Sequence, residues 1–220
     1  MQFVASTSTP RVDTTRHGEP IDDTLMEQLE GVMRTEPMWV RGSAAEVLVA
    51  DRTAALAEKK ARAIVCALGD MAAMDLSVGT SRGTILTPEE FWYDRFIGYL
   101  CGLWEANSQM ELTPAPGAGR GRDAVVIARS RRGDRDVAAE LLRIIQDPQA
   151  GMFRAWAAEG LCKIGTKDHV EILTRLAQSD EMRGYYPGSL PPPLPDPPVR
   201  PVRVAAHQAL NETKAREHLP

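Results

Sequence analysis

A nine-residue pattern occurs three times in the chain, and it constrains the fold more than any other feature. The copies are VRGSAAEVL from Val40, FRAWAAEGL from Phe153 and VRVAAHQAL from Val202. In each copy an apolar residue precedes an arginine, and the fifth and ninth positions hold alanine and leucine. Residues four apart lie on one stripe of an α-helix, and alanine in that stripe lets a neighbouring helix approach closely. The repeat therefore predicts several copies of one tightly packed helix.

A second repeat supplies a partner for that helix. The sequence DRDVAAELLRIIQ from Asp134 aligns with TKDHVEILTRLAQ from Thr166 at a shift of 32 residues, and each copy follows a glycine. The apolar positions coincide, and Asp136 aligns with Asp168, so we expect both aspartates to cap a second amphipathic helix. Neither helix of such a pair can bury its apolar stripe alone. The pairs must therefore stack on one another.

These residues resemble a known family. FRAWAAEGLCKIG followed by TKDHVEILTRLA is similar to HEAT repeats of the short bacterial kind, which also occur in armadillo-like and PBS-lyase-type proteins and follow the pattern VRxxAAxALGxIG plus a second helix. The resemblance is good over residues 134–213, fair over 22–68 and poor over 69–120. It implies an all-α fold, an α-solenoid of stacked antiparallel helix pairs, and it carries no catalytic residue across.

The repeats and the composition along the chain predict the domain organisation. Residues 1–21, rich in Ser, Thr, Pro and Arg, read as a flexible tail, and 214–220 as a short C-terminal tail. The solenoid would occupy residues 22–213, with a divergent repeat over 69–120. Residues 181–200 contain RGYYPGSLPPPLPDPPVR, whose prolines favour polyproline II and predict an insertion between two helices.

Local signals place several helices within this frame. Asp22 can cap a first helix that ends before Pro37, and a longer helical stretch, broken once, follows over residues 40–74. A threonine, a proline and two glutamates precede residues 91–106, so we expect a helix there. Two prolines and three glycines predict a loop over 113–121.

Charge and cysteine content bear on the class of protein. The net charge is −4, but residues 1–111 hold 10 basic and 17 acidic residues whereas 112–220 hold 16 and 13. An acidic chain disfavours a dedicated nucleic-acid binder without excluding contacts by its C-terminal half. Three distant cysteines predict reduced thiols in the cytoplasm, and the chain shows neither a secretory signal nor an apolar span for a membrane.

The candidate binding residues lie on the second helices of the repeat. Arg143 and Arg175 occupy equivalent positions, so they would form a ladder on the concave face of a solenoid, suited to carboxylates or phosphates of an extended partner. The alternative is that each pairs with a nearby acid such as Glu140 or Glu171.

Two further segments could contact a partner. Tyr185 and Tyr186 belong to the proline-rich insertion and would either bind a partner or pack back on the helices. The tract GRGRDAVVIARSRRGDRD holds six arginines and three aspartates. It could meet nucleic acid or an acidic protein surface, and a solvated helix end explains it equally well.

No catalytic, cofactor or metal constellation stands out. The four histidines do not stand at metal-ligand spacing, and no phosphate-binding or nucleophile motif occurs. The aromatic cluster Phe91, Trp92, Tyr93 and Trp104 could form a pocket, although its helical spacing favours a place in the core.

We therefore expect a non-catalytic protein-binding or scaffold module without cofactors. The alternative is a nucleic-acid-associated protein resembling the HEAT-like alkylpurine DNA glycosylases.

Overall fold

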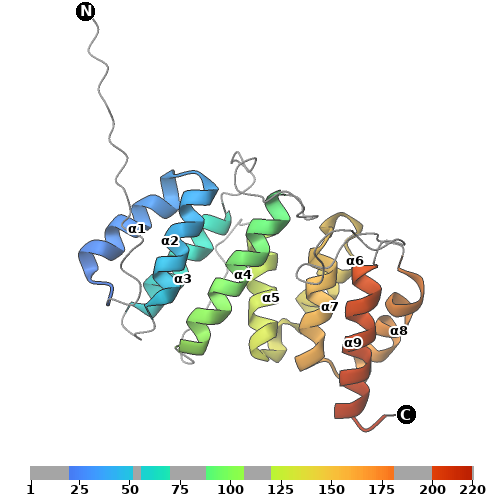
Figure 1. The fold of residues 1–220 in the computed structure, drawn as a ribbon. Coiled ribbons are helices and arrows are strands. Elements are labelled where there is room, and N and C mark those ends of the chain that lie inside the picture. The colour runs from blue at the N-terminus through green and yellow to red at the C-terminus, as the bar shows by residue number, and fades with distance from the viewer. Residues whose placement is uncertain (1–19, 52–55, 70–87, 107–119, 181–199, 220) are drawn as a thin grey trace, which may run out of the picture.

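The computed structural model describes residues 20–51, 56–69, 88–106, 120–180 and 200–219, and all regular elements in these ranges are helical (Figure 1). The expected all-α class is therefore confirmed for this part of the chain. The α-helices are α1 (Asp23–Thr35), α2 (Met38–Ala50), α3 (Ala57–Gly69), α4 (Pro88–Ala106), α5 (Arg120–Arg132), α6 (Ala138–Gln146), α7 (Phe153–Ile164), α8 (Val170–Ser179) and α9 (Pro201–Arg216), and short 3-10 turns are η2 (Arg135–Val137), η3 (Pro148–Ala150) and η4 (Lys167–His169).

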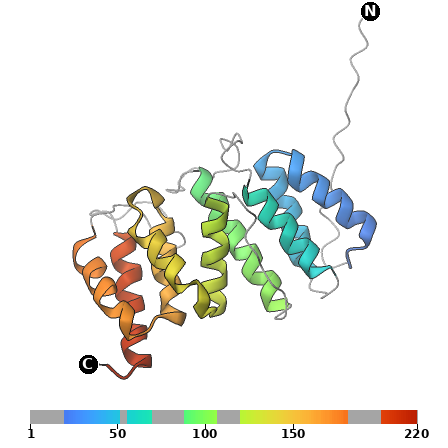
Figure 2. The ribbon, with the colours of Figure 1, turned by 180° about the vertical axis from the view of Figure 1, so that it is seen from behind.

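The helices lie side by side in an elongated molecule. Figures 1 and 2 show α1 to α3 at one end, α4 and α5 in the middle, and α6 to α9 at the other end. Helices α2 and α4 pack together, α5 packs against α4 and α7, and α9 packs against α7 and α8. A continuous cluster of buried apolar side chains runs through all these contacts. The core is therefore distributed along the molecule, between successive helices.

Several helix boundaries agree with the local signals. The side chain of Asp22 accepts a hydrogen bond of 2.7 Å from the amide of Leu25, and α1 ends before Pro37. The stretch after Val40 is broken between α2 and α3, as expected. Helix α4 covers the predicted segment 91–106, which confirms that prediction.

Both predicted tails end elsewhere than expected. Ile21 is buried, and its amide donates to Asp51 Oδ2 at 3.0 Å, so the ordered part begins before residue 22. Helix α9 continues to Arg216, because Thr213 is fully buried and the Arg216 guanidinium donates to the Gly165 carbonyl at 2.6 Å. Residues 1–19 and the insertion residues 181–199 lie outside the described ranges.

Helix α5 is an additional copy of the repeated first helix. It begins at Arg120, inside the predicted 113–121 loop, whose other residues up to 119 lie outside the described ranges. The order α5, η2, α6 is repeated as α7, η4, α8 at the same shift of 32 residues. At this shift Val125 and Arg129 of α5 align with Ala157 and Leu161 of α7. The nine-residue pattern therefore does not identify α5 in the sequence.

The predicted aspartate caps of the second helices are wrong. Each second helix begins with a 3-10 turn, so the capping residue lies two positions earlier than Asp136 or Asp168. The Asp134 carboxylate accepts from the Asp136 amide at 3.0 Å, and Thr166 caps η4 together with the ring of His169. Asp168 is an exposed residue inside the turn.

The aromatic cluster belongs to the core, as its spacing indicated. Trp92, Tyr93 and Trp104 are buried, and Phe91 is partly buried. Close helix contacts depend on glycine here: a Cβ at Gly42 would lie 2.3 Å from the ring of Trp92. Glycine therefore allows α2 to approach α4.

Candidate functional site

The arginine of each of the three nine-residue copies has the same structural role. Its Nε donates to a main-chain carbonyl at or just after the end of the α-helix that precedes it in the chain. The Nε to oxygen distances are 2.7 Å from Arg41 to Glu36, 2.9 Å from Arg154 to Ile145 and 2.7 Å from Arg203 to Asp180. A cation near a helix C-terminus satisfies carbonyls that have no intrahelical partner and interacts favourably with the helix dipole.

This role removes the repeat arginines from the candidate binding surface. Arg154 is further held by the carboxylate of Asp180, and their side chains are only 16% and 6% exposed. Arg41 is buried as a whole residue. These arginines join helices that follow one another in the chain.

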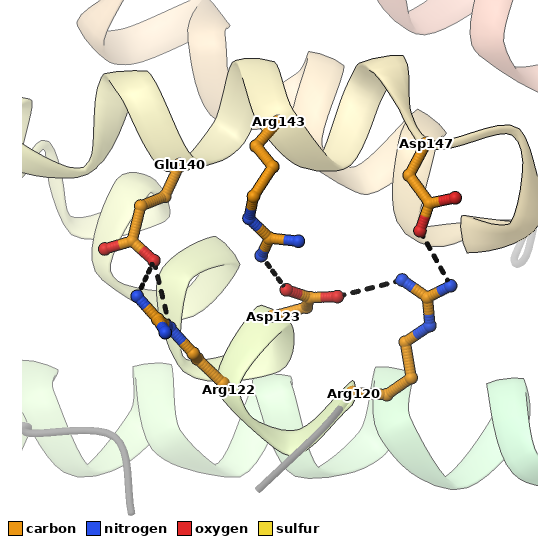
Figure 3. Close-up of polar contacts among 6 residues, drawn as sticks. All are labelled: Arg120, Arg122, Asp123, Glu140, Arg143 and Asp147. Carbon is orange, nitrogen blue, oxygen red and sulfur yellow. Dashed lines mark hydrogen bonds and ion pairs between the residues drawn. The ribbon is translucent and has the colours of Figure 1, made fainter. Parts of the chain in front are cut away.

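A charged face on α5 and α6 holds the predicted binding residue Arg143 (Figure 3). Asp123 on α5 is buried, and its two carboxylate oxygens accept from Arg143 Nη2 and, at 3.0 Å, from Arg120 Nη1. Arg120 also donates through Nη2 to Asp147 at 3.0 Å. Asp123 and Asp147 therefore hold Arg120 between α5 and the C-terminal end of α6.

The second pair on this face lies nearer the solvent. Arg122 donates to one oxygen of Glu140 through Nη2 at 2.9 Å and through Nε at 3.2 Å.

The hydrogen bond from the amide of Gln149 lowers the pKa of Asp147 below its ordinary value, and the guanidinium of Arg120 adds to this effect. The six residues of Figure 3 thus carry three positive and three negative formal charges.

The two arginines of the predicted ladder, Arg143 and Arg175, have different surroundings in the structure. Arg143 is paired with an acid, but the acid is Asp123 on another helix and not Glu140. Arg175 and Glu171 are both exposed on α8, and neither forms an ion pair with another described residue. Tyr185 and Tyr186 lie outside the described residues. No local signal could have revealed the Arg143 partner, which is 20 residues away in the sequence.

Most of the arginine tract is neutralised by the chain itself. Beyond the pairs above, Arg129 donates to Asp134 at 2.8 Å, and the Arg132 guanidinium lies 5.4 Å from the ring centre of Trp104. The tract is mainly a helix buried along α4 and α7, and only its last turn fits the expected solvated helix end. Its positive charge is therefore largely committed within the protein.

A third charged cluster lies where α4, α5 and α7 meet. Arg131 Nη2 stands 3.4 Å from Glu159 and 4.0 Å from Asp94. Burial raises the pKa of both carboxyl groups, against the opposing effect of the Arg131 charge. The single guanidinium of Arg131 thus forms ion pairs with two partly desolvated carboxylates. Sequence spacing could not reveal this cluster, because each residue comes from a different helix.

Within the described ranges, no group of three or more histidine, cysteine, aspartate or glutamate residues is arranged to hold a metal ion. None of the described helices is both long and apolar enough to cross a membrane. Comparison with protein-family models, with curated proteins and with solved structures gives no match. The resemblance to HEAT repeats therefore remains a prediction from the sequence.

Proposed function

We propose that the chain is an α-solenoid of the HEAT and armadillo-like kind that binds a protein partner on the concave face formed by its second helices. The observation that supports a repeated architecture is the common hydrogen bond of Arg41, Arg154 and Arg203 to the end of a preceding helix. A stack of such units buries its apolar stripes between neighbours. It leaves the polar faces of α6 and α8 as an extended surface.

The charge pattern on α6 and α8 favours a protein over a nucleic acid. Glu140 and Arg143 on α6, and Glu171 and Arg175 on α8, place both signs of charge on the same surface. Nucleic acid requires an excess of unpaired positive charge to replace its counterions. A mixed surface instead suits a protein partner with complementary charges.

The second candidate function is association with nucleic acid. The observation that favours it is the exposure of Arg122 and Arg143, whose side chains are 57% and 52% exposed although each is paired. Fluorescence anisotropy with generic duplex DNA at increasing salt separates the two functions. Phosphate contacts would give a steep loss of affinity with salt, whereas the protein-binding proposal expects no measurable DNA binding at physiological salt.

The main test uses the double substitution E171A/R175A, because these side chains make no ion pair with any described residue. The matched control is E58A/R62A, an exposed acid and arginine at the same spacing on α3. A partner that co-purifies with the chain is first purified, and its dissociation constant is then measured for each variant by titration calorimetry. We expect E171A/R175A to weaken binding tenfold or more and E58A/R62A to leave it unchanged. Equal affinities would contradict the proposal.

A further inference from the structure

The surface of α2 and α4 carries aromatic side chains that the proposed function does not use. The two helices run in the same direction, because Gly42 lies against Trp92 and Val49, about two turns later on α2, lies against Gly102, nearly three turns later on α4. Trp39 is one turn before Gly42. The register therefore places Trp39 beside the first turn of α4.

Trp39 is the most exposed large hydrophobic residue among those described, with 49% of its surface exposed. On α4, the Arg95 guanidinium lies 5.6 Å from the ring centre of Phe91 and 5.9 Å from that of Tyr99. Glu46 on α2 accepts from the Tyr99 hydroxyl at 3.0 Å and also binds Arg95. We call Trp39, Phe91, Arg95 and Tyr99 the α2–α4 aromatic surface.

The composition of this surface indicates what it would bind. Tryptophan, tyrosine and arginine are the residues that contribute most to binding at protein interfaces. Exposed aromatic rings are also the usual contact for proline-rich segments, whose polyproline II conformation is formed before binding and costs little entropy to order.

The chain itself contains a proline-rich segment. Residues 188–199 read GSLPPPLPDPPV and contain one charged residue, Asp196. Arg95, the basic residue of the aromatic surface, already binds Glu46 but remains 40% exposed, and it is the residue that the Asp196 carboxylate would approach. We propose that the α2–α4 aromatic surface binds the proline-rich segment 188–199 of a second copy of this chain.

The geometry of the segment's anchors favours the second copy over the same chain. Its flanks are held together, because Arg203 Nε donates to the Asp180 carbonyl at 2.7 Å. The chain between these flanks, residues 181–199, has a contour length of about 59 Å at the polyproline II rise, so with both ends fixed it reaches at most about half of this, roughly 30 Å. Helix α2 is separated from α9 by α4, α5 and α7 (Figure 1), and helices pack at about 8 to 10 Å per step, roughly 32 to 40 Å in total.

Binding to a second copy joins one end of the molecule to the opposite end of the next. Such a contact is heterologous, so each copy keeps one free surface and one free segment, and growth continues with concentration unless the assembly closes into a ring. This inference concerns another face than α6 and α8. Its failure would leave the proposed partner binding untouched.

The first experiment measures binding of the isolated segment. A fluorescent synthetic peptide of residues 188–199 is titrated with the full chain, and its anisotropy is compared with that of a peptide whose prolines are replaced by alanine. We expect the parent peptide to bind and W39A to lower the affinity at least tenfold. The control V204A removes a residue of similar exposure, 47%, on α9 and should have no effect. Equal binding by the W39A variant would overturn the proposal.

The second experiment tests the second copy. Sedimentation velocity of the full chain should show association that increases with concentration. Both W39A and a deletion of 188–199 should remain monomeric. An equimolar mixture of these two variants should form a heterodimer, because one supplies the segment and the other the surface. A parent chain that stays monomeric at every concentration, or a mixture that does not associate, would overturn the proposal, whereas E171A/R175A should behave like the parent.

Discussion

The two ends of the molecule hold their buried charges in different ways. Between α2 and α3, Lys60 is fully buried and binds both the side chain and the main-chain carbonyl of Asp51, whose carboxylate also accepts from the amide of Ile21. In the α5 to α9 region, carboxylates are bound by arginines that also reach neighbouring helices, as Arg120 does between Asp123 and Asp147. The first arrangement centres on one buried lysine–carboxylate ion pair, and in the second the carboxylates and arginines of neighbouring helices are shared.

This difference predicts how much stability each region loses when one charged residue is replaced. Removing one member of a buried ion pair leaves a charge without its counter-charge, whereas a network of several arginines and carboxylates retains other charged partners. The following substitutions test this difference, in order of expected effect.

The largest loss of stability is expected for K60M in the α1 to α4 region. Asp51 would remain buried without the ammonium group that balances its charge, although the amide of Ile21 still donates to it, and breaking a buried ion pair costs about 3 to 5 kcal/mol. Urea unfolding measures the loss. The double variant K60M/D51L should recover part of it, and a loss below about 1 kcal/mol for K60M would contradict the importance of the pair.

A smaller loss is expected for R154A in the α5 to α9 region. It removes hydrogen bonds to the Ile145 carbonyl and to the Asp180 carboxylate, and the expected loss is about 1.5 to 3 kcal/mol in total, the range for hydrogen bonds to charged groups. Arg203 still donates to the main-chain carbonyl of Asp180, so α9 keeps its contact with the C-terminal end of α8. R154K, which keeps the charge but not the Nε geometry, should recover only part of the stability in the same urea experiment. Full recovery would show that charge alone matters.

The third prediction concerns the close contact of α2 with α4. G42A would place a methyl group against the ring of Trp92, and such overpacking costs about 1 to 3 kcal/mol. G31A on α1 is the control, because nothing lies within 4 Å of its Cβ position. Alanine there should stabilise the helix by up to about 1 kcal/mol. Thermal unfolding that ranks both variants equally would contradict the packing argument.

The smallest effect is the pH dependence of the junction between α4, α5 and α7. Burial raises the pKa of Asp94 and of Glu159 above their ordinary values of 3.8 and 4.5. An acid with a raised pKa in the folded protein binds its proton more tightly there. Its cost to stability is therefore present at neutral pH and is removed as the pH falls through the raised pKa towards the ordinary value.

Arg131 on α5 is the charged group that faces both acids, and the charge of Asp94 further raises the pKa of Glu159. Burial raises the pKa of the neighbouring Cys162 thiol to about 11, so this thiol stays neutral in the tested range. The double variant D94N/E159Q should lose this part of the pH dependence of stability. Urea unfolding of parent and variant between neutral and mildly acidic pH makes the comparison. Identical pH profiles would show that the two acids do not titrate differently on folding.

Local signals predicted the helices whose cause is local. The Asp22 cap, the break after α2 and the helix at 91–106 rest on neighbouring residues, so they could be found without the structure. Helix α5 was partly missed because Val125 and Arg129 replace the marker residues of the repeat. The helix caps were misplaced because the choice between a 3-10 turn and an α-helical turn depends on small differences in geometry.

The sequence by itself determined the all-helical class and the repeated helix, because helical periodicity and alanine stripes are properties of neighbouring residues. Only the tertiary structure decided the partners of the charged side chains. Arg143 binds Asp123 rather than an acid on its own helix, and Arg131 is placed between Asp94 and Glu159. Such pairings depend on how helices distant in sequence are packed, and desolvation at those contacts, not spacing along the chain, sets their strength.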